Sequence, residues 1–222
     1  MDTEGNGTLR EKVYRYLRRE LANGNLIPGS YIDQNEICER LHISRAPMRD
    51  ALIQLEAERF VQIFPRRGVL IRKLTFKDIK SSYQIAAALE SAVVSCEFER
   101  LTPAHVREME RLNETLRIDL EDENFDAYYE NNLAFHHVYM DLSDNDHLKS
   151  ILTLIIQRLY DFPRMQYNKS WERINLHEHQ RFTDAVRAGN CEAAVSIIRN
   201  EHWSFDHHRE YLVKVYGLDE GS

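Results

Sequence analysis

The stretch Ile43-Ser44-Arg45-Ala46-Pro47-Met48-Arg49-Asp50-Ala51-Leu52 predicts a helix whose start is marked in the sequence. Ser44 is placed to act as the N-cap, with a hydroxyl that can accept a hydrogen bond from an early backbone N–H. Pro47 falls in the first turn, where its missing N–H costs little. Apolar residues then recur at helical spacing and predict a buried stripe: Met48, Ala51, Leu52 and Leu55.

Two arginines give this helix a face that could bind DNA. Arg45 and Arg49 are four residues apart, so they share one side of the helix close to its N-terminus. A helix that enters the major groove end-on would bring these guanidinium groups to guanine O6 and N7, or to a phosphate. The same spacing is also typical of an ordinary solvent-exposed helix face, so the flanking sequence has to decide between the two interpretations.

Two shorter helices are predicted before this one. A capping box at Thr8–Glu11 opens a helix that ends near residues 23–24, and Asp33–Glu36 offers a second capping box for a short helix. Only residues 42–43 separate that short helix from the one that begins at Ser44. Three helices with a very short turn between the last two form the helix-turn-helix pattern.

A β-hairpin is predicted directly after the third helix. Residues 60–64 and 68–71 are short runs of β-type sequence joined by a turn. Arg66 and Arg67 lie at its tip, and Gly68 permits a close backbone approach to a phosphate or a groove edge. This hairpin is expected to form the wing of a winged helix.

Residues 9–72 resemble the winged-helix DNA-binding domain of GntR-type bacterial transcriptional regulators. The resemblance is carried by Pro28-Gly29, Glu36-Ile37, Leu41, the stretch 44–52, Leu55-Glu56 and Arg67-Gly68-Val69. It implies that operator DNA is contacted by Ser44, Arg45, Ala46, Arg49, Arg66, Arg67 and Gly68. One departure is Arg59, where the family usually has glycine before the wing strand.

The charge of the chain is distributed unevenly. The net charge is −7, yet residues 1–75 hold 13 Lys and Arg against 10 Asp and Glu, whereas the remainder holds 16 against 26. This asymmetry fits a DNA-facing N-terminal part and an acidic C-terminal part. Because the basic excess is modest, the positions of the arginines indicate a DNA partner more strongly than the net charge does.

The composition argues against a membrane-embedded or secreted protein. There is no run of about 18 apolar residues, and the N-terminus lacks the basic and apolar regions of a signal peptide. The three cysteines form no CxxC pair and are expected to be reduced, buried thiols: Cys38, Cys96 and Cys191. We therefore expect a cytoplasmic protein without a membrane partner.

The pattern from Thr75 to Tyr216 is helical almost throughout, with no convincing strand. Six or so helices are expected, the last of them continuous over residues 192–215, and they would make an all-α bundle. The predicted fold is thus mainly α, with a winged helix-turn-helix domain over residues 1–74 and an all-α bundle over residues 75–222. The bundle resembles the FCD effector-binding domain of the FadR branch of GntR regulators.

Helical phase divides the histidines of the bundle into two groups. His136, His179 and His202 fall on apolar stripes of three different helices and are expected to point inward. His207 and His208, near the chain end, are expected to be exposed. Three unpaired imidazoles in a low-dielectric core would be costly, and one divalent cation would satisfy all three. The alternative is three core histidines that are each hydrogen-bonded separately.

The resemblance to metal-binding FCD domains favours the cation. Those domains have an Asp four residues before the first of the three histidines, and Asn132 stands there in this chain. The resemblance therefore implies Asn132, His136, His179 and His202 as the ligands of an ion such as Zn, Ni or Mn, with the Asn132 carbonyl either coordinating the ion or only orienting a water. An amide in place of the Asp would leave the site one charge more positive, with weaker metal binding and a stronger attraction for a carboxylate. Ala86 is a second departure, because many family members carry an inward Arg there.

The sequence thus predicts a ligand-controlled transcription regulator that is not an enzyme. The resemblance implies a homodimer, expected to be a repressor, that places two winged helices on a pseudo-palindromic operator. It also implies a small organic acid as the effector, which would bind in the bundle and release the operator. One alternative is a regulator for which the cation itself is the signal. The other is a metal-dependent hydrolase, which is disfavoured because no HExxH motif is present and Glu178 is expected to face away from the histidines.

Overall fold

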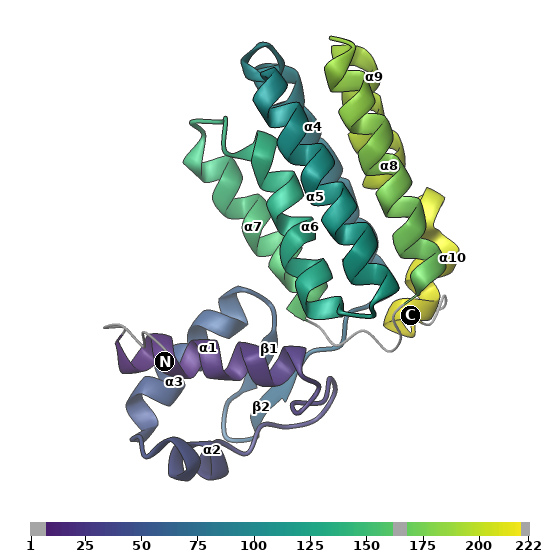
Figure 1. The fold of residues 1–222 in the computed structure, drawn as a ribbon. Coiled ribbons are helices and arrows are strands. Elements are labelled where there is room, and N and C mark those ends of the chain that lie inside the picture. The colour runs from purple at the N-terminus through teal and green to yellow at the C-terminus, as the bar shows by residue number, and fades with distance from the viewer. Residues whose placement is uncertain (1–7, 162–167, 219–222) are drawn as a thin grey trace. The chain divides into compact units, whose positions relative to one another are not determined.

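The computed structural model describes residues 8–161 and 168–218, which form two compact units. One unit runs to Thr75 and the other begins at Phe76. Residues 157–161, the last part of helix α7 (Asp146–Asp161), are also grouped with the first unit, and the rest of that helix belongs to the second. Figure 1 shows the order of the elements along the chain.

The first unit is a winged helix, as the sequence predicts. Two antiparallel strands follow its three helices, with Val61 paired to Ile71 and Phe64 to Gly68. Helix α3 packs against α1, α2 and β1. The elements are α1 (Leu9–Ala22), α2 (Gln34–Leu41), α3 (Arg45–Ala57), β1 (Val61–Phe64) and β2 (Gly68–Ile71).

Local hydrogen bonds explain where the first two helices begin and end. Thr8 and Glu11 form the predicted capping box, with the Thr8 N–H donating to the Glu11 carboxylate at 2.9 Å. Asp33 caps α2 by accepting from two backbone N–H groups of its first turn. His42 ends α2 in the left-handed conformation (φ 51°), which makes the short turn before α3 possible.

Ser44 precedes α3 as predicted, but the prediction that its hydroxyl caps the helix is wrong. Within the described residues its side chain makes no capping hydrogen bond. An N-cap side chain usually accepts from the second or third helical N–H, and the third helical residue here is Pro47, which has none. The Ser44 hydroxyl is therefore left exposed on the surface.

Arg59, the departure from the family pattern, adopts the conformation for which glycine is favoured. Its φ is 64°, between the end of α3 and the start of β1. Phe60 follows it and is fully buried in the core of the unit, together with Leu55. The left-handed residue thus redirects the chain so that Phe60 can enter the core, even though a side chain with a Cβ strains this conformation.

The second unit is all α over its described residues, as predicted. Helix α5 packs against α6 and α8, while α4 packs against α6, α9 and η2. None of the described helices is both long and apolar enough to cross a membrane. The elements are α4 (Phe76–Glu97), the 3-10 turn η1 (Phe98–Arg100), α5 (Pro103–Glu121), α6 (Phe125–Met140), α7 (Asp146–Asp161), α8 (Lys169–Arg187), α9 (Cys191–Ile197), the π-helical turn η2 (Ile198–His202) and α10 (Phe205–Tyr216).

The single last helix predicted over residues 192–215 is wrong. The chain forms α9 and the π turn η2, breaks at Trp203 and Ser204, and resumes as α10. Ser204 opens the new helix by accepting a hydrogen bond from the backbone N–H of His207 at 3.3 Å. This break resets the helical phase, so His208 is buried, with 1% of its surface exposed, and not exposed as predicted. His207 is exposed, as expected.

The cysteines differ in burial. Cys38 is buried as predicted, whereas Cys96 is exposed near the end of α4 and Cys191 is half-buried at the start of α9. All three are free thiols. The prediction of buried thiols is therefore confirmed for Cys38, wrong for Cys96 and only partly met by Cys191.

Candidate functional site

The N-terminal end of α3 presents a polar surface to solvent. Ser44, Arg45, Ala46 and Arg49 are all exposed. The Arg49 side chain is 74% exposed, and its nearest carboxylate, that of Asp50, lies 3.8 Å away. A loose, solvated pair of this kind contributes little, so the Arg49 guanidinium remains available to a partner.

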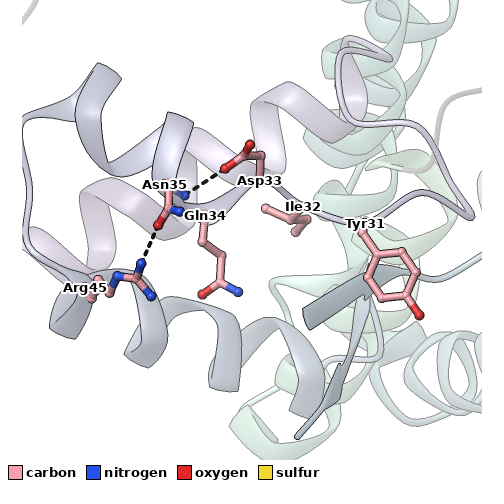
Figure 2. Close-up of a pocket in the computed structure, with 6 residues that line it drawn as sticks. All are labelled: Tyr31, Ile32, Asp33, Gln34, Asn35 and Arg45. Atoms are coloured by element: carbon pink, nitrogen blue, oxygen red, sulfur yellow. Dashed lines mark hydrogen bonds between the residues drawn. The ribbon is translucent and has the colours of Figure 1, made fainter. Parts of the chain in front are cut away.

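Asn35 holds Arg45, which the sequence interpretation did not foresee. Arg45 Nη2 donates to Asn35 Oδ1 at 2.6 Å, and the Asn35 backbone N–H donates to the Asp33 carboxylate at 3.0 Å (Figure 2). Asn35 lies in the first turn of α2 and Arg45 in the first turn of α3, so this bond joins the two helices of the motif. These residues border an open hollow of about 450 Å³ lined by Tyr31, Ile32, Asp33, Gln34, Asn35 and Arg45.

The two arginines predicted at the wing tip are exposed to solvent. Arg66 and Arg67 are exposed in the turn between β1 and β2. Gly68 has φ 111°, and a Cβ there would lie 3.2 Å from the Tyr31 ring. The tight turn that exposes the arginines therefore depends on glycine at position 68.

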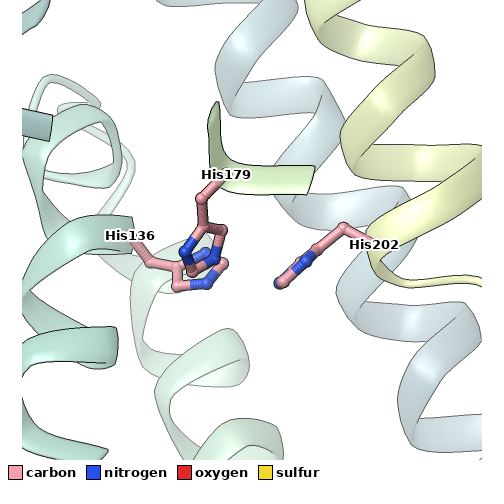
Figure 3. Close-up of side chains that lie close together, drawn as sticks. All are labelled: His136, His179 and His202. Atoms are coloured by element: carbon pink, nitrogen blue, oxygen red, sulfur yellow. The ribbon is translucent and has the colours of Figure 1, made fainter. Parts of the chain in front are cut away.

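The three inward histidines of the second unit meet, as the helical phase predicts. His136 comes from α6, His179 from α8 and His202 from η2, and all three are buried. Their rings point toward one another (Figure 3), with ring nitrogens within 4.8 Å of each other and ring centroids 5.0 to 5.2 Å apart. This arrangement is close enough for one ion to contact all three rings.

Glu90 of α4 orients the first of these rings. Its carboxylate is fully buried and accepts hydrogen bonds from His136 Nδ1, the Tyr139 hydroxyl and Trp203 Nε1. Burial would raise the pKa of Glu90, but His136 and the Tyr139 hydrogen bond hold it below its usual value. With Nδ1 engaged, His136 Nε2 is left buried without a hydrogen-bond partner in the described structure.

Glu178 of α8 orients the third ring, so the prediction that it faces away from the histidines is wrong. It is only 2% exposed, and His202 Nδ1 lies 3.0 Å from its Oε2 atom. Burial would raise the pKa of Glu178, but His202 and His208 lower it to about 2. Both His179 and its neighbour Glu178 are buried because α8 is covered by α5 and by α9 with η2.

His179 has no hydrogen bond to satisfy it in the described part of the chain. Both of its ring nitrogens are buried without a partner, and the ring stacks on Phe135 with centroids 4.0 Å apart. Burial, with His202 and His136 nearby, lowers the pKa of His179 well below 6.5. The ring is therefore neutral at pH 7, with one nitrogen lone pair free to bind a cation.

These contacts match what a metal centre needs. Three imidazoles are a known ligand set of zinc sites that keep a position open, and metal-binding histidines commonly donate their other ring N–H to a carboxylate, a backbone carbonyl or a water. Here two of the three histidines have such a carboxylate behind them. Glu90 and Glu178 also bring two negative charges to the cluster, so the expectation of a more positive site took no account of charges from α4 and α8.

Comparisons with known proteins decide the family. Residues 81–203 match the FCD domain, and residues 9–71 match the bacterial regulatory proteins of the gntR family. This chain is a GntR-family regulator with an FCD domain. The GntR-FCD regulator is accordingly a DNA-binding transcription regulator and not an enzyme, as the sequence predicts.

Relatives of the GntR-FCD regulator agree with this assignment. It is 28% identical over 212 residues to the HTH-type transcriptional regulator YdhC of Bacillus subtilis (strain 168), over 95% of this chain and 92% of YdhC. It is 27% identical over 146 residues to the HTH-type transcriptional repressor RspR of Escherichia coli (strain K12), over 65% of this chain and 64% of RspR. A GntR regulator from Rhodococcus sp. RHA1 shares the fold, with a TM-score of 0.71 at 22% identity over 91% of this chain and 97% of that one.

The two bundle residues of the GntR-FCD regulator that differ from the family pattern, Asn132 and Ala86, are both buried. Asn132 is buried on α6 one turn before His136, so an amide and not a carboxylate faces the same side of that helix. Ala86 is fully buried on α4 and brings no charge to the interior. Any ion in the cluster would thus be held mainly by neutral imidazole nitrogens.

Proposed function

We propose that this regulator binds a pseudo-palindromic operator as a homodimer and represses transcription. Arg45 and Arg49 read base edges in the major groove, while Ser44 and Ala46 lie against the sugar-phosphate backbone. The wing residues Arg66, Arg67 and Gly68 contact phosphate or the groove edge. The observation that supports this assignment is the exposure of both α3 arginines at the helix end that is presented to solvent. Repression is inferred from the name of RspR.

The DNA-binding assignment is tested by selecting binding sites from a pool of random duplexes with the full chain. We expect two half-sites in inverted orientation. Arg45→Ala should lower affinity for the selected site by about 1–3 kcal/mol, or roughly 5- to 150-fold, because a bidentate arginine–guanine contact contributes that much. Arg199→Ala removes an exposed charge from the second unit and should leave affinity unchanged. Undiminished binding by the Arg45 variant would contradict the assignment.

We propose further that the histidine cluster binds a divalent cation through His136, His179 and His202, with the Asn132 carbonyl as a fourth ligand. The observation that supports this is the burial of both His179 ring nitrogens without a hydrogen-bond partner among the described residues. An isolated polar group of this kind is costly, and a cation removes that cost. When bound, the ion supplies a positive centre to which the carboxylate of a small organic acid can bind, and that effector releases the operator.

A specific observation also favours the cation itself as the signal. Glu90 and Glu178 together offset the two positive charges of a divalent ion, so the loaded cluster has little excess charge with which to attract an anion. Such a site responds to the metal and less to an organic acid. This second candidate shares every ligand with the first.

Elemental analysis of purified protein separates these candidates from a metal-free pocket. We expect about one divalent ion per protomer, lost in His136→Ala. Operator binding is then measured for the metal-free protein, the Zn-loaded protein, and the Zn-loaded protein with citrate or succinate. A change on adding Zn alone favours the metal signal, and a change that needs the acid favours the effector. Absence of metal after incubation with Zn, Ni and Mn would contradict both.

A further inference from the structure

His208 lies behind the histidine cluster, in a position that the proposed metal site does not use. It is almost fully buried on α10. Trp171 Nε1, from the first turn of α8, donates to His208 Nδ1 at 3.1 Å. On the other side of the ring, His208 Nε2 lies 3.3 Å from Glu178 Oε1. His208 thus stands between an indole N–H and the carboxylate that contacts the cluster.

The indole decides where the proton of His208 sits. Tryptophan Nε1–H is a donor only, so His208 Nδ1 must keep its lone pair to accept from Trp171. A neutral imidazole carries its one hydrogen on the other nitrogen, which here is Nε2. His208 Nε2 and Glu178 Oε1 are both buried and lie 3.3 Å apart, and neither has a hydrogen bond of full geometry in the described structure, so the carboxylate oxygen is the acceptor nearest to this N–H.

The contacts continue from Glu178 to the cluster. Its second oxygen, Oε2, accepts from His202 Nδ1 at 3.0 Å. Because Nδ1 of His202 then carries the hydrogen, Nε2 of His202 keeps its lone pair. We propose that Trp171 and His208 are positioning residues, which act through Glu178 to fix the His202 tautomer whose Nε2 is free to bind a cation.

On the other side of the cluster, a second buried carboxylate also accepts from the Nδ1 atom of a cluster histidine. Trp203 Nε1 donates to Glu90, and the Glu90 carboxylate accepts from His136 Nδ1. The chain has two tryptophans, Trp171 and Trp203, and each donates the outermost hydrogen bond of one of these two lines of contacts. What recurs is a buried carboxylate at the Nδ1 atom of a cluster histidine with an indole N–H beyond it, which reaches Glu90 directly and Glu178 through His208. This recurrence supports a positioning role over incidental packing.

The arrangement also excludes a competing use of these side chains. Glu178, His207 and His208 have ligand atoms within 4.8 Å of one another, which is close enough for a second cation. With the Trp171 bond in place, however, His208 Nε2 carries a hydrogen and cannot be a ligand. The positioning role and a second metal site at His208 are therefore mutually exclusive.

The tautomers can be measured directly in the metal-free protein, by nitrogen-15 NMR of the histidine rings at a pH above their last titration. We expect hydrogen on Nδ1 of His202 and on Nε2 of His208. In Trp171→Phe, His208 should become a mixture of tautomers. Hydrogen on Nε2 of His202, or a His208 ring that is unaffected in Trp171→Phe, would overturn the proposal. This readout does not depend on the proposed function, since it is valid whether or not the protein binds metal.

The functional consequence rests on the proposed metal site and is measured as Zn affinity by chelator competition. We expect His208→Leu to weaken binding by about tenfold, the lower end of the loss seen when an outer partner of a metal ligand is removed. His208→Gln, which can accept from the indole and donate to Glu178, should restore most of it. His207→Leu is the matched control, because His207 is exposed and 3.5 Å from the same carboxylate. Two Zn per protomer, with one lost in His207→Leu, would overturn the positioning role.

Discussion

Glu90 of α4 and His136 of α6 are joined by a hydrogen bond inside the bundle, between the buried carboxylate and Nδ1 of the ring. A charged acceptor strengthens this bond and raises the basicity of Nε2, the nitrogen available to a metal. We therefore expect Glu90→Gln to weaken Zn binding by about 10- to 100-fold, as measured by chelator competition.

Glu172→Gln is a matched control for this prediction. Glu172 is also a buried carboxylate of the second unit, and it accepts from Asn175. The substitution has the same size and the same loss of charge, and it should leave Zn affinity within about twofold of the parent. Equal losses in the two variants would show that buried charge in general, and not the bond to His136, determines affinity.

The hydrogen bond from Arg45 to Asn35 should increase the discrimination between bases by Arg45. The bond of 2.6 Å restricts the guanidinium to one position before DNA arrives, so part of the ordering cost is removed from binding. We expect Asn35→Ala to lower operator affinity by less than Arg45→Ala does, and to reduce discrimination against a mismatched half-site. Both are measured by titration against the selected duplex and a single-mismatch duplex.

A double-mutant cycle tests whether Asn35 acts through Arg45. If it does, the two substitutions should be non-additive, because each removes the same interaction. Strictly additive losses would mean that Asn35 contributes to DNA binding independently of Arg45.

The wing arginines should contribute through charge and not through sequence reading. Arg66→Ala and Arg67→Ala should each weaken binding to all duplexes about equally and reduce the slope of log K against log salt by about 1. Affinity measured over a range of KCl concentrations gives this slope. A variant that loses affinity for one sequence only, with the slope unchanged, would show base reading by the wing.

Arg59 holds a conformation that favours glycine, so Arg59→Gly should stabilise the first unit. Relief of the left-handed strain, reduced by the extra chain entropy of glycine, should raise the free energy of unfolding by about 0.5–1 kcal/mol. Gly24→Ala is the opposite case, since Gly24 has φ 73° with open space around it. That variant should be less stable by about 1 kcal/mol. Chemical denaturation of both variants checks the pair, and stabilisation by Gly24→Ala would refute the argument from strain.

The sequence could place the three cluster histidines because each follows a regular apolar stripe that continues at helical spacing. His208 could not be placed in this way, because the π turn and the break at Ser204 shift the phase of everything after them. Glu178 was missed for a different reason: α8 is covered on two sides, so neighbouring residues are both buried. For Glu90 a signal was present, since it is a carboxylate on the apolar stripe of α4 and such a group needs a partner. Which partner it meets depends on packing between helices, which the local pattern does not contain.

The amide at position 132 should affect both the stability of the second unit and its preference among metals. Asn132→Asp adds a third carboxylate to a buried region that already contains Glu90 and Glu178. Without metal this extra buried charge should destabilise the second unit, and with metal it should become an additional oxygen ligand. The rise in Tm on adding a divalent ion should therefore be larger in the variant than in the parent. It should increase most for Mn, because oxygen ligands favour Mn whereas imidazole suits Zn and Ni. A thermal-shift series with Zn, Ni and Mn measures this, and an equal shift in parent and variant would mean that residue 132 does not reach the ion.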